Sequence, residues 1–222
     1  MLIIGHGGAA GLAPENTISS FKLGQESGAQ ILEADLRRTK DGKIVLCHDS
    51  TLKRTHGIDK KISQMTLAEI KDATGKLGKE VPELSEFIGM AKLPVNLDVK
   101  ESGFEKEIIE SIKGFAYKVL ITSWNPLVIK KIKALDENID VGPIVGSGYR
   151  FLLPLVTTML RNTNVYSITV GPKLVSSRRM KNFKKLGWKV FPFTINDKQE
   201  FDRLKNLEVD GVFTDYPNKF IN

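Results

Sequence analysis

"ILEADL", residues 31–36, alternates apolar side chains with the two carboxylates Glu33 and Asp35. Residues of an extended strand point alternately to its two faces, so this stretch has one apolar and one acidic face. Such a strand fits a sheet that packs helices on one side and turns a polar face inward on the other. Seven further apolar, β-branched runs of strand length occur along the chain, at residues 2–6, 95–100, 118–123, 140–145, 165–170, 189–194 and 211–215.

Segments with apolar residues three or four positions apart lie between most of these runs, and that spacing is typical of a helix face. They are found at residues 15–28, 104–114, 125–138, 177–187 and 198–207. Eight strands that alternate with helices predict a parallel sheet, and eight is the number that closes into a (βα)8 TIM barrel. A doubly wound open sheet is the alternative, but the glycines after the first run lack the G-x-G-x-x-G spacing. We therefore predict an α/β fold of the TIM-barrel type.

The length of the chain suits one barrel. With 222 residues, it falls within the range of a single large domain, and we expect residues 1–222 to form one. Residues 51–82 are polar and separate the second strand from the helix expected after it. We predict that they form a small insertion above the barrel.

Composition restricts the partners and the location. The net charge is +7, but the lysines are scattered among glutamates without a basic block, so we expect small anionic ligands and no nucleic acid. No window has the roughly 18 apolar residues of a membrane span, which predicts no stable membrane insertion. The N-terminus does not resemble a signal peptide, and the single cysteine, Cys47, fits a reducing compartment. We expect a cytoplasmic protein, and a homo-oligomer is compatible with the sequence.

Three carboxylates are expected inside the barrel. In residues 95–100, Asp98 and Lys100 share the inward face, next to Glu33 and Asp35 of the preceding strand. Burying an unpaired charge costs several kcal/mol, so these acids need a cation. Hard oxygen ligands without sulfur favour Mg²⁺ or Ca²⁺ over a structural zinc. The alternative is a buried carboxylate–lysine network centred on Lys100.

Two of the three histidines are expected at the same end of the barrel. His6 ends the first strand and opens "HGGAAGLAPENT", residues 6–17. If "DG" at 41–42 is a two-residue turn, the resulting hairpin pairs Asp35 with His48. The sequence therefore predicts two imidazoles beside an acidic, metal-binding cluster, which is an arrangement suited to catalysis.

These residues resemble a known family. "HGGAAGLAPENT", "EAD", "TKDGKIVLCHDSTLKRT", "LDVK" and "DGVFTDYP" match, in order, motifs of the glycerophosphodiester phosphodiesterases. Members of this family are (βα)8 barrels with a small insertion after the second strand. They use a divalent cation to hydrolyse glycerophosphodiesters, such as deacylated phospholipids, to glycerol phosphate and an alcohol. The resemblance places the chain in lipid and glycerol metabolism.

The resemblance also implies roles for individual residues. His6 and His48 match the family's general base and general acid. Glu33 and Asp35 match metal ligands, and Asp98 stands where the third ligand is usually glutamate. Because the two histidines need opposite protonation states, this mechanism predicts a bell-shaped pH–rate profile.

The substrate pocket departs from the family pattern. Lys100 resembles a phosphate-contacting lysine, but Gly7 replaces an arginine that normally helps to hold the phosphate, and Phe193 replaces a tryptophan. Asn16 is a good helix N-cap, and we expect Glu15 and Asn16 to position the loop that carries His6. The resulting hypothesis is a metal-dependent phosphodiesterase for glycerophosphodiesters. The alternatives are a barrel that binds phosphate esters without hydrolysing them and a phosphodiesterase with a different headgroup.

Overall fold

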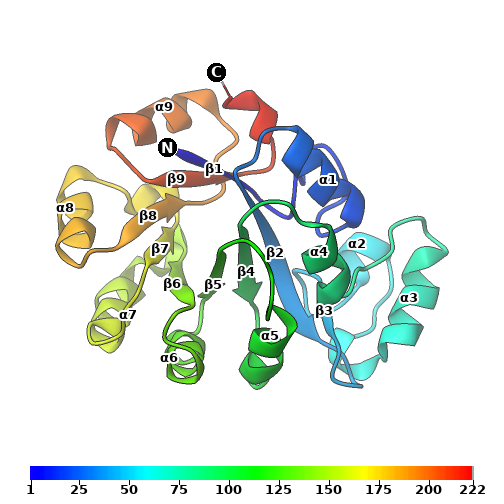
Figure 1. Ribbon diagram of the computed structural model, residues 1–222. Helices are drawn as coiled ribbons and strands as arrows, with labels where there is room; N and C mark the ends of the chain where they lie inside the picture. Colours follow the sequence, from blue (N-terminus) through cyan, green and yellow to red (C-terminus); the bar gives the residue numbers. More distant parts are fainter. Residues whose placement is uncertain (222) are drawn as a thin grey trace.

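The computed structural model describes residues 1–221, and within them eight parallel strands form a nearly closed barrel surrounded by helices (Figure 1). The first seven barrel strands pair in chain order, each with the next, and the eighth pairs with the first. The predicted (βα)8 TIM barrel is therefore confirmed, and the alternative prediction of a doubly wound open sheet is wrong. The barrel strands are β1 (Leu2–Gly5), β2 (Ile31–Arg38), β4 (Val95–Val99), β5 (Val119–Ser123), β6 (Asp140–Val145), β7 (Ser167–Val170), β8 (Lys189–Pro192) and β9 (Gly211–Thr214).

The seam between β8 and β9 is bridged by two backbone hydrogen bonds. The Asp210 N–H donates to the Val190 carbonyl at 3.1 Å, and the Ile195 N–H donates to the Phe213 carbonyl at 2.8 Å. Because β9 also pairs with β1, the first and last strands lie side by side despite their separation in sequence. The start of the chain and the residues that follow β9 consequently lie near each other, in the upper part of Figure 1.

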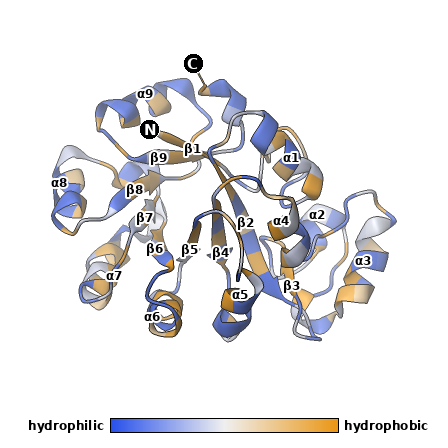
Figure 2. Ribbon diagram, in the orientation of Figure 1, coloured by the Kyte–Doolittle hydropathy of each residue, from blue (hydrophilic) through white to orange (hydrophobic). Residues whose placement is uncertain are grey.

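The helices cover the outside of the barrel, and their apolar residues close the main core against the outward faces of the strands. Figure 2 shows mostly hydrophobic strands, whereas α8 and α9 are largely hydrophilic. The surrounding helices are α1 (Ile18–Glu26), α4 (Leu84–Met90), α5 (Glu105–Ser111), α6 (Pro126–Leu135), α7 (Leu153–Leu160), α8 (Ser177–Lys185) and α9 (Lys198–Asn206). Short 3₁₀ segments complete the loops, at η1 (Ile62–Gln64), η2 (Ser147–Leu152), η3 (Pro172–Leu174) and η4 (Pro217–Lys219). None of the described helices is long and apolar enough to cross a bilayer.

The interior of the barrel is divided into an apolar and a polar part. Ile4, Leu120, Phe191 and Phe213 form a small buried cluster inside it. Further along the strands, inward positions carry acids and other polar groups instead. This division leaves the carboxyl ends of the strands as the polar end, which is where barrel enzymes place their chemistry.

The expected register of the hairpin after β2 is wrong by one residue. Strand β3 (Ile44–Leu46) pairs antiparallel with β2, with Leu36 opposite Leu46. The Cys47 N–H donates to the Asp35 carbonyl at 2.9 Å, so Asp35 lies opposite Cys47 and not opposite His48.

The physical reason is a three-residue loop in place of the expected two-residue turn. The Thr39 N–H donates to the Lys43 carbonyl at 2.9 Å, which leaves residues 40–42 outside the ladder. Gly42 has φ +80°, a left-handed conformation that glycine adopts without strain. A one-residue change in loop length is enough to shift every pair by one position.

Residues 51–82 fold beside this hairpin, outside the ring of barrel helices (cyan in Figure 1). They contain α2 (Lys53–His56), η1 and α3 (Leu67–Gly75). Their apolar side chains form a small core with residues of the hairpin: Val45, Cys47, Leu52, Ile62, Met65, Ile70 and Val81. The division into one domain of residues 1–222 with an insertion at 51–82 stays a prediction.

Candidate active site

A cavity opens among the carboxyl ends of the barrel strands. The predicted catalytic and metal-ligating residues all line it, together with two of the three expected substrate contacts: His6, Glu33, Asp35, His48, Asp98, Lys100 and Phe193. Trp124 and Phe213 also contribute to its walls. Gly7, Glu15 and Asn16 are not among the lining residues, and they act on the site through hydrogen bonds described below. One cavity therefore brings together residues from both ends of the sequence.

The three acids form one buried cluster. Asp35 on β2 lies directly opposite Asp98 on β4, and Glu33 lies two residues earlier on β2 with its side chain on the same face. Each residue is at most 5% exposed, and one carboxylate oxygen from each lies within 4.8 Å of the others. The group can therefore hold a single metal ion.

Lys100 neutralises part of this cluster. Its Nζ donates to Asp98 Oδ2 at 2.5 Å. It also lies 2.7 Å from Asp35 Oδ1, an ion-pair distance without the directionality of a hydrogen bond. Asp98 Oδ1 is buried without a hydrogen-bond partner among the described residues. The expected lysine network thus exists, but one ammonium group cannot balance three carboxylates.

The pKa values of the three carboxyl groups reflect their burial with too little positive charge nearby. Burial, followed by the charge of Asp35, raises the pKa of Glu33 to about 8. Burial also raises the pKa of Asp98, in spite of Lys100. Burial alone would raise the pKa of Asp35 too, but Lys100 and the histidines hold it below its usual range. Three hard oxygen donors with excess negative charge fit a divalent cation such as Mg²⁺ or Ca²⁺.

Backbone and amide groups from the loop after β1 orient two of the acids. The Gly7 N–H donates to Glu33 Oε2 at 2.7 Å. Asn16 Nδ2 donates to Asp35 Oδ2 at 2.7 Å, and its Oδ1 accepts from the Asp35 N–H at 3.0 Å. The side chain of Asn16 is therefore fully engaged with Asp35.

The expectation that Asn16 caps the first helix is wrong. Thr17 is the N-cap of α1, because its Oγ1 accepts from the Ser20 N–H at 3.2 Å. Asn16 precedes the cap in a left-handed conformation, with φ +56°. Asparagine tolerates this conformation better than most residues, and its amide reaches the neighbouring strand.

His6 is held by an acid from the opposite end of the chain. Its Nδ1 lies 2.7 Å from Asp215 Oδ1, and Asn196 Nδ2 donates to Asp215 Oδ2 at 2.5 Å. Burial alone would lower the pKa of His6, but the Asp215 hydrogen bond and the charges of Glu33 and Asp35 raise it to about 9. Asp215 thus holds the ring through Nδ1 and does not engage Nε2.

The sequence reasoning missed Asp215 and Asn196, although a signal for Asp215 was present. In a closed barrel the last strand lies next to the first, and the observed register pairs Gly5 with Thr214. The residues that follow these two, His6 and Asp215, must then be neighbours. Closure of the barrel is therefore enough to place Asp215 beside His6.

We expect Asp215→Asn to lower the pKa of His6 in the ion-free protein by at least about one unit. The amide keeps the shape of the side chain but removes the charge that favours the imidazolium form. An NMR titration of the imidazole resonances measures the change, with His56 as an internal reference. An unchanged His6 titration would contradict the assigned pairing.

His48 lies at the more exposed side of the cavity and is bound to the insertion. Its Nδ1 lies 2.7 Å from Asp49 Oδ1, and Arg54 Nε donates to Asp49 Oδ2 at 2.6 Å. Both terminal nitrogens of Arg54 donate to Glu15, at 3.0 and 2.5 Å. Arg37 donates to the His48 carbonyl through two nitrogens, at 3.1 and 2.8 Å.

These contacts place His48 at the cavity despite the shifted register. The ladder of β3 ends at Leu46, so the orientation of His48 depends on Asp49, Arg54 and Arg37 rather than on strand pairing. Sequence reasoning missed all three, because their contacts arise from a loop whose path the hydrophobic pattern does not predict. A series of side-chain contacts, Glu15–Arg54–Asp49–His48, therefore joins the loop after β1 to the insertion and to the second histidine.

Comparison with known proteins agrees with this geometry. Residues 6–219 match the model of the glycerophosphoryl diester phosphodiesterase family. A glycerophosphodiester phosphodiesterase of Caldanaerobacter subterraneus is 33% identical, over 100% of this chain and 96% of its own. A human lysophospholipase D is 28% identical, over 97% of this chain and 83% of its own.

Solved structures show the same architecture. A phosphodiesterase of Oleispira antarctica in complex with the product sn-glycerol-3-phosphate superposes with a TM-score of 0.88 at 29% identity, covering 99% of this chain and 94% of that one. A glycerophosphodiester phosphodiesterase of Thermotoga maritima also has a TM-score of 0.88, at 26% identity, with 99% and 96% covered. With the family model and the relatives matched over nearly their whole length, this chain is a phosphodiesterase that belongs to the glycerophosphoryl diester phosphodiesterase family.

Proposed function

We propose that this protein hydrolyses glycerophosphodiesters to glycerol phosphate and an alcohol, with a divalent cation and two histidines. The observation that carries the proposal is the cluster of three buried acids in one cavity with His6 and His48. The product-bound relative from Oleispira antarctica supports glycerol phosphate as the product.

Glu33, Asp35 and Asp98 would hold the cation, because their oxygens are buried, convergent and short of positive charge. When bound, the ion supplies charge neutralisation for the phosphate and polarisation of its oxygens. Lys100 adds a further positive charge at the same wall of the cavity. The expected contact between Phe193 and the substrate stays a prediction, as does a role for Gly7 beyond its hydrogen bond to Glu33.

The two histidines divide the proton transfers. We assign the general base to His6, which accepts a proton from the attacking glycerol 2-hydroxyl, and the general acid to His48, which protonates the leaving alkoxide. This first step releases the alcohol and leaves a cyclic phosphate, which water then opens to glycerol phosphate. In the ion-free protein, the pKa of about 9 keeps His6 protonated at neutral pH. Since part of that increase comes from the charges of Glu33 and Asp35, neutralising these acids lowers the pKa and favours the neutral base. A bell-shaped pH–rate profile is the expected signature.

The deciding experiment measures glycerol phosphate release from glycerophosphocholine and glycerophosphoethanolamine, with Mg²⁺, with Ca²⁺ or with EDTA. We expect release with at least one of the two ions and none with EDTA. Tight substrate binding without release under every condition would overturn the proposal in favour of a barrel that only binds phosphate esters. The expected cytoplasmic location and a homo-oligomeric state stay predictions.

The stability of the ion-free protein should decrease as the pH rises from about 5 to 9. His6 has a folded pKa of about 9 against 6.5, so its contribution is complete below pH 6.5 and is lost as the pH rises through 9. Glu33 has a folded pKa of about 8 against 4.5, so the folded state retains a proton that the unfolded chain releases between pH 4.5 and 8. Both groups therefore lower the free energy of unfolding over this window, by several kcal/mol at most.

A divalent cation should reverse this loss, because it replaces the protons as the partner of the acids. Denaturant unfolding at pH 6 and pH 9, with and without Mg²⁺ or Ca²⁺, measures the effect. We expect the ion to stabilise the protein more at pH 9 than at pH 6. Stability that is independent of both pH and the ion would argue against a cation site at these acids.

A further inference from the structure

A line of aromatic side chains leads out of the catalytic cavity to the surface. Trp124 and Phe193 line the cavity and meet edge to face, with ring centroids 6.0 Å apart. Trp124 also meets Tyr149, at 5.7 Å, and Tyr149 lies 6.4 Å from Phe151. Trp124, Tyr149 and Phe151 are 42%, 52% and 69% exposed, so exposure increases with distance from the cavity.

Two aliphatic residues extend this surface. Leu127 follows β5 at the start of α6, and Leu155 lies in the first turn of α7; they are 59% and 56% exposed. With the three exposed aromatics, they make up five of the twelve large apolar side chains that are exposed in the described residues. We call these five residues the apolar rim. Exposed apolar side chains concentrated in this way typically mark an interaction surface.

A basic groove adjoins the apolar rim between α7 and α8. Arg150, Arg178 and Arg179 line it, together with uncharged residues of the two helices. None of its lining residues within the described chain is acidic, and the three arginines form no ion pair in residues 1–221. Arg150 lies between Tyr149 and Phe151 in sequence, so groove and rim are continuous.

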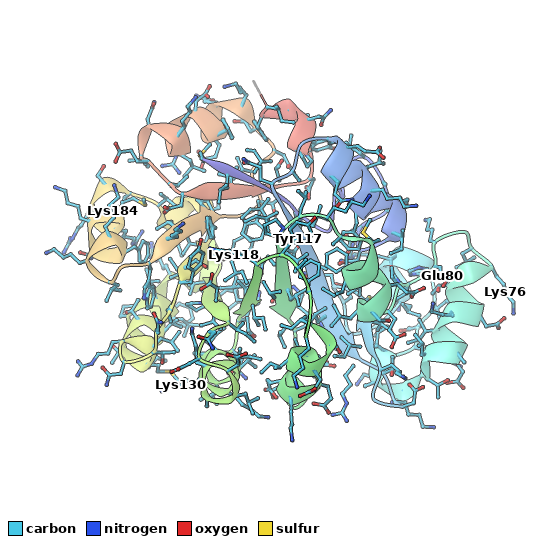
Figure 3. The ribbon with its side chains drawn as sticks, viewed as in Figure 1. Lys76, Glu80, Tyr117, Lys118, Lys130 and Lys184 are labelled. Carbon is cyan, nitrogen blue, oxygen red and sulfur yellow. The ribbon has the colours of Figure 1, made fainter. Side chains whose placement is uncertain are left out.

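Helix α8 extends the positive charge beyond the groove. Its sequence, "SRRMKNFKK", contains five basic residues and no acid. Lys184, labelled in Figure 3, pairs with Glu208, but no other basic residue of α8 has an ion-pair partner in the part of the chain that the structure describes. The surface therefore combines exposed aromatic rings with a local excess of positive charge.

We propose that the apolar rim and the basic groove together bind the surface of an anionic phospholipid bilayer. Tryptophan and tyrosine favour the interfacial region of bilayers, where one part of the ring is apolar and the other hydrated. Arginines bind headgroup phosphates, and each basic residue near an anionic surface contributes about 1 kcal/mol. Because Trp124 belongs to both the rim and the cavity, this contact directs the mouth of the catalytic cavity toward the membrane.

The charge distribution favours a bilayer over a second copy of the chain. In a symmetric dimer, the same patch of both protomers meets itself, so the unpaired arginines of two copies would be brought together. Like charges at such a contact are repulsive, whereas an anionic surface complements them. The proposal does not depend on the hydrolytic function, because binding to a bilayer needs no turnover.

Flotation of the full chain with vesicles tests the proposal. We expect binding to vesicles that contain phosphatidylglycerol, weaker binding to pure phosphatidylcholine, and release as the salt concentration rises. Intrinsic fluorescence adds a local reading, because the chain has two tryptophans and Trp188 is only 5% exposed. A blue shift on vesicle addition then reports on Trp124.

Two variants separate the apolar from the basic contribution. Phe151→Ser should raise the lipid concentration needed for half-binding about five- to tenfold, since it removes one aromatic side chain that would be buried in the bilayer. The double variant Arg178→Gln/Arg179→Gln should raise it by at least about tenfold and abolish the preference for anionic lipid. Tyr117→Ser is the matched control, because Tyr117 is 43% exposed but precedes β5, at the end of the barrel away from the cavity. It should bind vesicles like the unmodified chain.

Other outcomes would overturn the proposal. These are a lack of vesicle binding, or binding that Phe151→Ser and the double arginine variant leave unchanged. Self-association without lipid, lost in Phe151→Ser, would identify the rim as an interface between two copies instead. Thermal unfolding of each variant checks that the exposed substitutions leave the fold intact.

Discussion

His6→Ala and His48→Ala should each lower the rate of glycerophosphodiester hydrolysis by about 10²-fold or more. In the proposed mechanism, one imidazole accepts a proton as the phosphorus–oxygen bond forms and the other donates a proton as the alkoxide leaves, so neither can substitute for the other. Each histidine has a dedicated acid on Nδ1, Asp215 for His6 and Asp49 for His48. This pairing fixes both rings with their second nitrogen available for proton transfer.

Cation binding distinguishes a catalytic defect from a damaged site. Calorimetric titration of Mg²⁺ or Ca²⁺ into both variants should give affinities no weaker than that of the unmodified chain. Neither histidine belongs to the acidic cluster, and His6→Ala removes a positive charge that competes with the cation for Glu33 and Asp35. His56→Ala is the control, since His56 is the third histidine and its Nε2 contacts the Lys79 carbonyl at 2.7 Å within the insertion. It should retain full activity. Full activity of either His6→Ala or His48→Ala would remove the assigned roles.

The pH profile adds a second reading of the same pair. If His6 is the base and His48 the acid, each variant should lose one limb of the bell-shaped profile and retain the other. A flat profile between pH 5 and 9 in the unmodified enzyme would contradict acid–base catalysis by two histidines.

The sequence predicted the barrel and the acidic cluster because both depend on short-range alternation. In "ILEADL" and "VNLDVK", one set of alternate residues is entirely apolar and the other set carries the acids. This pattern specifies which side chains face the interior. Parallel neighbours then align Asp35 with Asp98, without any information about loops. The structure therefore places Glu33, Asp35 and Asp98 at one interior cavity, as alternation indicates, while their roles stay a prediction.

Features that depend on loop geometry were not predictable in the same way. The hairpin register failed because the chain uses three loop residues, which the "DG" signal alone does not distinguish from two. Asparagine is a residue type that often caps helices, yet the amide of Asn16 binds Asp35, and Thr17 caps the helix. Arg54 orients Asp49 from within the polar insertion, whose sequence lacks the hydrophobic periodicity that would predict its structure. In each case, one hydrogen bond between distant segments decides between conformations of similar local propensity.

Asp98→Asn should weaken divalent binding by on the order of 10²-fold. Two unit charges about 4 Å apart interact by about 4 kcal/mol at an effective dielectric constant of 20, so losing one carboxylate costs a divalent ion at least about 3 kcal/mol. Asp98 is suited to this test because one of its oxygens binds Lys100, while the other is buried without a hydrogen-bond partner among the described residues. The amide keeps the size of the side chain and removes only its charge.

Stability supplies a reading that does not require activity. Burial raises the pKa of Asp98, so its charge is unfavourable in the ion-free protein. Asp98→Asn should therefore unfold at equal or higher denaturant concentration without an ion, yet gain much less from Mg²⁺ or Ca²⁺ than the unmodified chain. Asp140→Asn is the matched control, since Asp140 begins β6 at the end of the barrel away from the acids.

The two measurements separate a cation site from a lysine-centred network. If Lys100 alone balanced the cluster, removing the charge of Asp98 would break a buried ion pair and destabilise the protein by about 3 kcal/mol or more. If the acids exist to hold a cation, the same change relieves repulsion between Asp35 and Asp98 and leaves the ion-free fold intact. Opposite signs of the stability change are thus expected from the two interpretations, and a strongly destabilised Asp98→Asn with unchanged divalent affinity would exclude the cation site.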